Sequence, residues 1–298
     1  MQLLSKGFHH ITTIAGDPQA NLDFYVGTLG MKLVKQTVNH DDATMYHFYF
    51  GDEIGRPGTL LTSFPIPGAG PSIPGAGEVS RIVFGVSAAG MDVLVRKLGG
   101  TRVTRRFGTD EVVFNDPDGL ELALVVDPSI QHDRLGRVVR VDIQWMTDRN
   151  TPRVLEGLFG AERIGEESGI QRYQIGDGMV DLVPTNHTRF GRGGQGSVHH
   201  IAFRSKDEAD SGAMRSAALD LGLRITEVID RNYFKSMYFR EPGGVLFEIA
   251  TDGPGMDVDE PIEALGQSFV LPPWMESHRA EILQVLPSVS IPGLEVSV

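Results

Sequence analysis

Apolar and polar positions near the N-terminus change their period within a short stretch. Residues 7–14 alternate in part and are rich in Ile and Thr, which predicts a β-strand. Apolar residues then recur at helical spacing between Asp17-Pro18, which suits a helix start, and Gly30, which suits a helix end. Three further strands are predicted at residues 31–38, 45–50 and 59–64. The pattern predicts a βαβββ module over residues 7–64.

The same order of elements returns three times along the chain, in residues 79–127, 137–185 and 197–251. Similar turns support the repeat, with DPDG at residues 116–119 of the second module and EPGG at residues 241–244 of the fourth. Solenoids and propellers also repeat at such a period, but each unit here combines a helix with a curved sheet. We expect an α+β fold in which four βαβββ modules form paired half-barrels in two similar domains, residues 1–130 and 137–251.

Two segments lie outside these modules. Residues 64–78 contain PGAG twice and predict a long loop that joins two modules or covers a site. Residues 252–298 are rich in proline and acidic residues at first and form a C-terminal extension. Within it, residues 274–286 predict a short amphipathic helix that docks on the barrel. His278 in this helix is expected to be a surface or packing residue rather than a ligand.

Composition narrows the chemistry. The net charge of -12 and the pI near 5.2 argue against a nucleic-acid or anionic-membrane partner. The chain has no cysteine, which excludes disulfides, thiolate metal sites and a cysteine nucleophile. Any metal must therefore be held by His, Asp or Glu. No apolar run approaches about 18 residues and no signal peptide is evident, so no membrane span and a cytoplasmic location are expected.

Two adjacent histidine pairs occupy equivalent strands, His9 and His10 in GFHHITTI and His199 and His200 in SVHHIAFR. Because side chains alternate across a strand, only one histidine of each pair should face a shared cavity. In the fourth module the bulky apolar residues that follow share the face of His199, whereas small or polar residues share the face of His200. This parity selects His200, and the same parity in the first module selects His10.

A single carboxylate, Glu248, lies inside the apolar strand of EPGGVLFEIA. Its apolar neighbours define the core face, so Glu248 is expected to point to the cavity. Two histidines and one carboxylate form a facial triad with open coordination positions, which suits Fe(II), with Mn(II) as the next choice. An ion pair with Arg204 or Arg231 is the alternative way to satisfy a buried glutamate.

Only the first and fourth modules carry these ligands, so we expect these two modules to face each other and modules two and three to be structural. Alignment of the two turns places Ala123 of the second module where the fourth has Glu248. The same comparison is expected to place Ile82 where the fourth module has His200.

At these residues the sequence resembles the vicinal oxygen chelate superfamily of glyoxalases, bleomycin resistance proteins and extradiol dioxygenases. Within it, the chain is similar to the ring-cleaving dioxygenases that act on hydroquinones and chlorohydroquinones. The resemblance covers essentially the whole chain and rests on four tracts: GFHHITTIAGDPQANLDFYVGTLGMKLVKQTVN, YHFYFGDEIGRPGTLLTSFP, SVHHIAFR and DRNYFKSMYFREPGGVLFEIATD. It implies Fe(II) as cofactor, with O2 and a small aromatic diol as partners.

The resemblance also assigns residues. The family's iron ligands fall on His10, His200 and Glu248, in agreement with the parity argument. Its surrounding catalytic residues fall on His9, His199, Arg231 and Tyr238. Tyr238 and Arg231 are expected to orient substrate oxygens or stabilise negative charge, with aromatic packing and a surface ion pair as the alternatives. The two histidines are expected to act as acid or base, or as outer partners of the metal ligands.

Other interpretations stay open. His47 and Tyr49 share one face of YHFYF, where packing is favoured over a place in the pocket. A glyoxalase-type isomerase or lyase would need a carboxylate or amide in a fourth ligand position, and GTLLTSFP of the first module has no Asp or Glu. A non-catalytic small-molecule binding protein of the resistance type would need no metal triad. Assembly into a homo-oligomer is compatible with the sequence.

Overall fold

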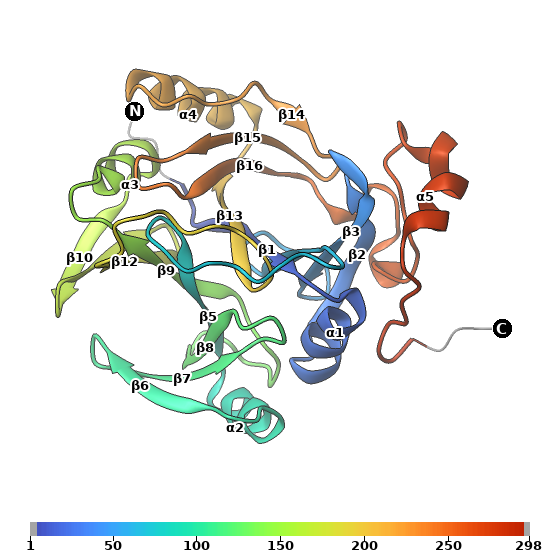
Figure 1. The fold of residues 1–298 in the computed structure, drawn as a ribbon, viewed down its shortest axis with the longest axis horizontal. Coiled ribbons are helices and arrows are strands. Elements are labelled where there is room, and N and C mark those ends of the chain that lie inside the picture. The colour runs from blue at the N-terminus through green and yellow to red at the C-terminus, as the bar shows by residue number, and fades with distance from the viewer. Residues whose placement is uncertain (1–4, 295–298) are drawn as a thin grey trace.

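A computed structural model describes residues 5–294 and contains four modules, each with a strand, a helix and three further strands (Figure 1). The first comprises β1 (Phe8–Ala15), α1 (Pro18–Leu22), a π-helical turn (Asp23–Thr28), β2 (Lys32–Asn39), β3 (Asp42–Gly51) and β4 (Leu60–Pro65). The second comprises β5 (Val79–Val86), α2 (Ala88–Lys97), β6 (Arg102–Arg106), β7 (Thr109–Asn115) and β8 (Glu121–Val126). None of the helices in residues 5–294 is long and apolar enough to cross a membrane.

The second half of the chain repeats this order. The third module comprises β9 (Val138–Trp145), α3 (Thr151–Phe159), β10 (Glu162–Glu167), β11 (Ile170–Ile175) and β12 (Gly178–Pro184). The fourth comprises β13 (Ser197–Ser205), α4 (Glu208–Asp220), β14 (Ile229–Asp230), β15 (Phe234–Arg240) and β16 (Leu246–Pro254). The predicted α+β class with four βαβββ modules is confirmed.

The modules combine into two eight-stranded curled sheets. One sheet has the order β14-β15-β16-β13-β1-β4-β3-β2 and joins the fourth module to the first. The other has the order β10-β11-β12-β9-β5-β8-β7-β6 and joins the third to the second, in the lower part of Figure 1. The expectation that the first and fourth modules meet is confirmed by the antiparallel pairing of β1 with β13. Each sheet thus draws on both halves of the chain, and the division into domains 1–130 and 137–251 stays a prediction.

The start of the first helix follows from its sequence. The Asp17 carboxylate accepts a hydrogen bond from the backbone N–H of Ala20 at 2.7 Å, and Pro18 occupies the first turn. The α-helix ends at Leu22 and continues as the π-helical turn, rather than as one regular helix up to Gly30. Gly30 ends the segment with a φ of 71°, a backbone conformation that glycine adopts without strain.

The apolar faces expected for β13 and β16 form the core. Ile201, Phe203, Phe247 and Ile249 are fully buried there. Phe159, from α3 of the third module, stacks on Phe203 with ring centroids 4.0 Å apart. The opposite faces of β13 and β16 carry His200 and Glu248, so the parity predicted for these two residues is confirmed.

One strand of the fourth module differs from the prediction. A strand is expected over residues 224–229, but the structure has only the two-residue β14 at this edge. Thr226 still bonds the neighbouring strand, since its N–H donates to the Tyr238 carbonyl at 3.0 Å and its hydroxyl accepts from the Tyr238 N–H at 3.0 Å. Because a side chain replaces a backbone acceptor here, the segment follows β15 without forming a regular ladder.

The C-terminal extension packs against the first module, as expected. Its helix α5 (Arg279–Val285) lies beside β2 and β3 in Figure 1 and buries Ile282. The α-helix is shorter than predicted because a 3₁₀ turn (Glu276–His278) forms the start of the predicted segment. A fully buried lysine fixes the start of the extension, since Lys35 Nζ of β2 lies 2.5 Å from Asp259 Oδ1 and 2.6 Å from Glu260 Oε2.

Replacement of Lys35 by methionine should therefore destabilise the protein. Lys35→Met keeps the length of the side chain but leaves Glu260, itself 6% exposed, without its cation. Removal of one partner of a buried ion pair costs about 3–5 kcal/mol. Urea denaturation measures this loss in the free energy of unfolding, with Lys206→Met on the surface as the control. Equal stability of the two variants would show that the lysine does not hold the extension in place.

Candidate metal centre

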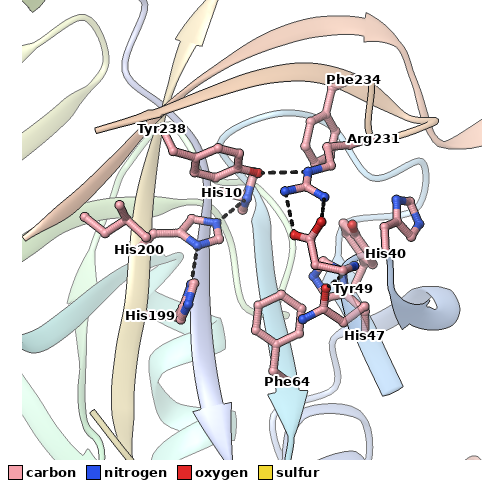
Figure 2. Close-up of a pocket in the computed structure, with 13 residues that line it drawn as sticks. His10, His40, His47, Tyr49, Phe64, His199, His200, Arg231, Phe234 and Tyr238 are labelled. Atoms are coloured by element: carbon pink, nitrogen blue, oxygen red, sulfur yellow. Dashed lines mark hydrogen bonds and ion pairs between the residues drawn. The ribbon is translucent and has the colours of Figure 1, made fainter. Parts of the chain in front are cut away.

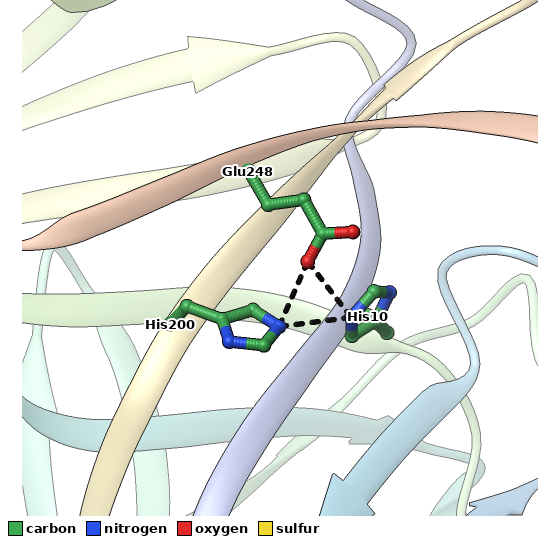
Figure 3. Close-up of side chains that lie close together, drawn as sticks. All are labelled: His10, His200 and Glu248. Atoms are coloured by element: carbon green, nitrogen blue, oxygen red, sulfur yellow. Dashed lines mark hydrogen bonds and ion pairs between the residues drawn. The ribbon is translucent and has the colours of Figure 1, made fainter. Parts of the chain in front are cut away.

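Three side chains from neighbouring strands meet at one point in the first sheet (Figure 3). His10 Nε2 of β1 and His200 Nε2 of β13 lie 3.1 Å apart. Glu248 Oε2 of β16 lies 2.8 Å from the Nε2 atom of His200 and 3.3 Å from that of His10. All three side chains are buried, and Glu248 is completely inaccessible to solvent. The structure thus brings together the three residues predicted as ligands.

The geometry of Glu248 fits a divalent cation. Its Oε1 accepts a short hydrogen bond from the hydroxyl of Ser236, but within the described chain no donor satisfies its buried Oε2. The two imidazole nitrogens are close to Oε2 without the angles of a hydrogen bond. Ligand atoms about 2.1 Å from one ion and at about right angles are about 3 Å apart, which matches the three distances. A buried carboxylate oxygen without a donor is costly, and a cation at this point would remove that cost.

Electrostatics at the triad favours the charged form of Glu248. Burial alone would raise the pKa of Glu248, but the neighbouring His10 and His200 outweigh it and hold this pKa well below its usual range. Burial lowers the pKa of His200, against the attraction of Glu248. A charged carboxylate is the form of glutamate that binds a divalent metal. The alternative in which Arg204 neutralises Glu248 is wrong, because Arg204 pairs with Asp252 at 2.8 Å.

Each ligand histidine is supported from behind by the histidine that precedes it. His9 Nδ1 lies 2.9 Å from His10 Nδ1, and His199 Nδ1 lies 2.7 Å from His200 Nδ1. Burial, followed by repulsion from His10, lowers the pKa of His9 to about 3, and the surrounding protein and His200 also lower the pKa of the more exposed His199. Both rings are therefore neutral near pH 7, and each can accept a hydrogen bond from the Nδ1–H of a ligand. Such outer partners fix the orientation of a metal-binding imidazole.

Irregular pairing explains how adjacent histidines approach each other. The β1–β13 register skips His9 between Phe8 and His10, and it skips His199 between the partners of Thr12 and Thr13. A bulge of this kind re-aims a side chain that strict alternation would send to the other face. The expectation that His199 points away from the cavity is therefore wrong, and His199 lines the cavity together with His200. His9 lies behind His10 on a separate cavity beside Tyr233.

His10 and His200 of the triad line a cavity of about 390 Å³ (Figure 2). Arg231 and Tyr238 form part of its wall, and Arg231 Nε donates to the Tyr238 hydroxyl oxygen at 3.2 Å. The same guanidinium pairs with Asp41 at 2.9 and 3.1 Å. Three of the four residues predicted to be catalytic thus line the cavity, namely His199, Arg231 and Tyr238. The fourth, His9, does not.

The cavity also contains residues that the sequence analysis assigned to packing or did not mark. His47 and Tyr49 of β3 line it, so the expectation that both only pack is wrong. They are two residues apart on β3, and this spacing was the sequence signal that both side chains lie on one face. His40 and Asp41 come from the hairpin between β2 and β3, and no motif marks them.

A chain of hydroxyl groups connects His47 to the triad. Thr62 Oγ1 lies 2.9 Å from His47 Nε2 and 2.7 Å from Thr12 Oγ1, which in turn lies 2.8 Å from His200 Nε2. Strand register explains the place of Thr62. The residue two positions after each ligand histidine pairs with Glu248 in the fourth module and with Thr62 in the first. A threonine therefore occupies the position in which a symmetric site would have its fourth ligand.

In the second sheet an ion-pair cluster takes the place of the triad. By strand register, Arg140 corresponds to His10 and Arg81 corresponds to His200. The expectation that Ile82 holds the place of His200 is wrong by one residue, and such a shift moves a side chain to the opposite face. Glu111 accepts from Arg140 at 2.6 Å and from Arg81 at 2.8 Å. These opposite charges neutralise one another, which supports a structural role for modules two and three.

Removal of the Ser236 hydroxyl should weaken metal binding without altering a ligand. Ser236→Ala frees Glu248 Oε1 to rotate, and loss of such an outer contact costs about 10–100-fold in metal affinity. Competition between the protein and a chelator for Fe(II) or Mn(II), without oxygen, measures this change. Glu248→Ala should remove binding, and Ser216→Ala on the surface of α4 is the matched control. Unchanged affinity in Ser236→Ala would contradict the assigned role of the serine.

Acid should destabilise the protein through buried histidines, and His40 offers a test away from the triad. Burial, aided by the charge of Arg231, lowers the pKa of His40 to about 4. The folded state then binds fewer protons than the unfolded state, so this stability is present above pH 6.5 and is lost as the pH falls towards 4. His40→Asn should flatten the dependence of unfolding free energy on pH by up to about 1.4 kcal/mol per unit. Urea denaturation between pH 7 and 4.5 compares His40→Asn with His278→Asn, in which an exposed histidine is replaced. Equal slopes of unfolding free energy against pH in the two variants would refute the lowered pKa of His40.

Known proteins with similar sequences belong to the family that the site geometry suggests. The profile of the "Glyoxalase/Bleomycin resistance protein/Dioxygenase superfamily" matches residues 7–124 and 154–249. The chain is 40% identical to "Putative ring-cleaving dioxygenase MhqO" of Bacillus subtilis (strain 168), over 95% of this chain and 96% of that protein. It is 32% identical to "Chlorohydroquinone/hydroquinone 1,2-dioxygenase" of Sphingobium indicum, over 94% of this chain and 96% of that protein.

A solved structure agrees over nearly the full length. It is the crystal structure of a "putative dioxygenase" from Bacillus subtilis subsp. subtilis str. 168. This structure superposes on the chain with a TM-score of 0.92. The two chains are 38% identical, with coverage of 98% of this chain and 99% of the other. The resemblance inferred from the sequence is thereby confirmed. The chain belongs to the glyoxalase, bleomycin resistance protein and dioxygenase superfamily, and within it to the ring-cleaving dioxygenases.

Proposed function

We propose that the chain is an Fe(II)-dependent dioxygenase of the extradiol type that opens the ring of a hydroquinone-type aromatic with O2. The observation that carries this proposal is the buried Glu248 Oε2 without a donor, held beside two imidazole nitrogens at the wall of an aromatic cavity. An apolar cavity of about 150 Å³ holds benzene. A cavity of about 390 Å³ therefore has room for a dihydroxylated ring together with a second small molecule.

The three ligands account for the choice of cofactor. Two neutral imidazoles and one carboxylate on one face of an ion leave open positions and are typical of non-haem Fe(II) sites. An ion held there would lower the pKa of a substrate hydroxyl and would supply redox chemistry toward O2. Mn(II) has the same preference for nitrogen and oxygen ligands and is the second choice.

Aromatic side chains hold the ring in place. Phe64, Tyr49 and Phe234 line the cavity, and planar rings of this kind favour stacked or edge-to-face contact with an aromatic substrate. Their apolar surfaces also exclude water from the triad, which strengthens every charge interaction in the cavity. The cavity beside the three ligands therefore suits a flat, apolar molecule with polar groups at its edges.

Arg231 and Tyr238 provide a polar contact for a substrate oxygen. Burial raises the pKa of Tyr238, and the nearby Glu248 raises it further, so the hydroxyl stays protonated. Because it accepts from Arg231, the Tyr238 O–H remains able to donate to the substrate. Burial opposes the charge of Arg231, but its bonds with Asp41 and Tyr238 outweigh burial and raise its pKa. A fixed cation beside a donor hydroxyl stabilises negative charge that develops on a substrate oxygen.

The two outer histidines divide their roles by position. His199 lines the cavity in a neutral form, and while its Nδ1 accepts from His200 its other ring nitrogen carries a hydrogen that can donate to a substrate oxygen. His9 lies behind His10 and supports the orientation of that ligand.

Two other functions are less well supported. A glyoxalase-type isomerase would need a fourth metal ligand, and Thr62 occupies the position of that ligand. A protein that only binds a small molecule would gain nothing from the triad, and the burial of its carboxylate without a cation would cost stability.

Oxygen uptake tests the proposal. Protein reconstituted with Fe(II) without oxygen should consume O2 with hydroquinone, methylhydroquinone or chlorohydroquinone, and less with catechol. His200→Ala and Glu248→Ala should abolish uptake. Arg231→Met should keep its metal but lose on the order of 100-fold in kcat, the scale expected for one stabilising donor. Arg215→Met, which removes an exposed ion pair with Glu227, is the matched control. Protein that holds one iron and consumes no O2 with any hydroquinone would contradict the proposed function.

A further inference from the structure

A second cavity of about 380 Å³ adjoins the first. His199 and Leu246 line both, so the two cavities meet at these side chains. Figure 2 shows His199 beyond His200, on the side away from Arg231. The second cavity contains none of the three ligands, Arg231 or Tyr238. His199 and Leu246 therefore lie between the metal cavity and the second cavity.

Two loops between modules build the outer wall of this second cavity. The Pro/Gly-rich loop that follows β4 and the loop that follows β12 pair with each other. The Ile73 N–H donates to the Arg192 carbonyl at 2.9 Å, and the Gly191 N–H donates to the Ala76 carbonyl at 2.9 Å. Gly77 from the first loop and Phe190 from the second line the cavity. The end of the second PGAG thus lines a cavity, and the expected role of the loop as a cover over a site stays a prediction.

The walls of the second cavity are mainly apolar and carry no net charge. Six apolar side chains line it: Ile14, Val79, Phe190, Val198, Val245 and Leu246. Arg240 and Glu78 are its charged residues, and they offset each other. Arg240 Nη1 donates to the Gly244 carbonyl at 2.8 Å, and Glu78 Oε1 accepts from the Gly75 N–H at 2.8 Å. The chemistry suits an uncharged, apolar group.

We propose that the second cavity is a subsite for a substituent on the substrate ring. This inference rests on the proposed function. A ring bound at the triad would direct one of its substituents past His199 and Leu246 into the second cavity. The preferred substrates are then hydroquinones with an uncharged apolar side chain of several carbons, such as an alkyl chain. An unsubstituted ring would leave the apolar walls of the second cavity in contact with water.

Chain length gives a direct measurement. Calorimetric titration of the Fe(II)-loaded protein without oxygen gives the Kd of methylhydroquinone and of pentylhydroquinone without turnover. Each methylene that leaves water tightens binding by about fourfold when it is fully buried. The four additional methylenes of the pentyl chain should together lower the Kd on the order of tenfold or more. Burial of apolar surface should also make the heat-capacity change more negative for the longer chain.

A variant that fills the second cavity provides the control. A Cβ at Gly193 would lie 3.6 Å from Ile14 Cδ1 and 3.8 Å from Ser197 Oγ, which is ordinary contact on an unstrained backbone. Gly193→Leu should therefore fold, occupy the cavity and abolish the advantage of the pentyl chain. Gly70→Leu is the matched control, since a Cβ there has no neighbour within 4 Å. It should bind both ligands as the unmodified protein does.

The outcomes separate this inference from the proposed function. A pentyl chain that binds no tighter than methyl, or an advantage that persists in Gly193→Leu, overturns the subsite. Tighter binding of a carboxyl-terminated chain of equal length overturns its uncharged character. Oxygen uptake with methylhydroquinone in either case leaves the proposed function intact. A chain-length effect that Gly193→Leu removes supports the subsite even in protein that consumes no O2.

Discussion

The antiparallel pairing of β1 with β13 is the interaction on which the site depends. It joins the two ends of the modular chain and places His10 and His200 on neighbouring strands with their Nε2 atoms 3.1 Å apart. The parallel pairing of β13 with β16 then adds Glu248 beside them. Because side chains alternate, a slip of one residue in either pairing would send a ligand into the core. The large apolar residues on the opposite face of these strands resist such a slip, so core packing also fixes the geometry of the triad.

The two half-barrels share one topology but balance their buried charges in different ways. The first gathers two imidazoles and a carboxylate whose Oε2 has no donor among the described residues, an arrangement that is balanced only by a cation. The second holds Arg81 and Arg140 at the corresponding positions, and Glu111 accepts from both. Buried charges in the second sheet are thus neutralised within the protein. Among the described residues, the first sheet combines a His–His–Glu cluster with an adjoining aromatic cavity, and the proposed chemistry is therefore assigned to that sheet.

The sequence predicted what depends on periodicity and composition. Alternation along three strands was enough to select His10, His200 and Glu248, because a regular strand separates its core face from its cavity face. It failed at His199, where a bulge breaks the alternation, and no residue in SVHHIAFR signals that bulge. It also failed at Ile82, since alignment of turns cannot resolve a shift of one residue that strand pairing fixes. His40 and Asp41 reach the cavity from a hairpin whose direction depends on tertiary packing rather than on any local pattern.

The central claim is that His10, His200 and Glu248 hold one divalent metal, and anomalous X-ray scattering from crystals loaded with Fe(II) or Mn(II) tests it most directly. The account predicts a single strong peak about 2.1 Å from the Nε2 atoms of both histidines and from Glu248 Oε2. The outer rings of His9 and His199 should remain behind the ligands and out of reach of the ion. A peak bound elsewhere, or no peak in protein whose Glu248 Oε2 instead accepts a hydrogen bond from a protonated imidazole, would contradict the account.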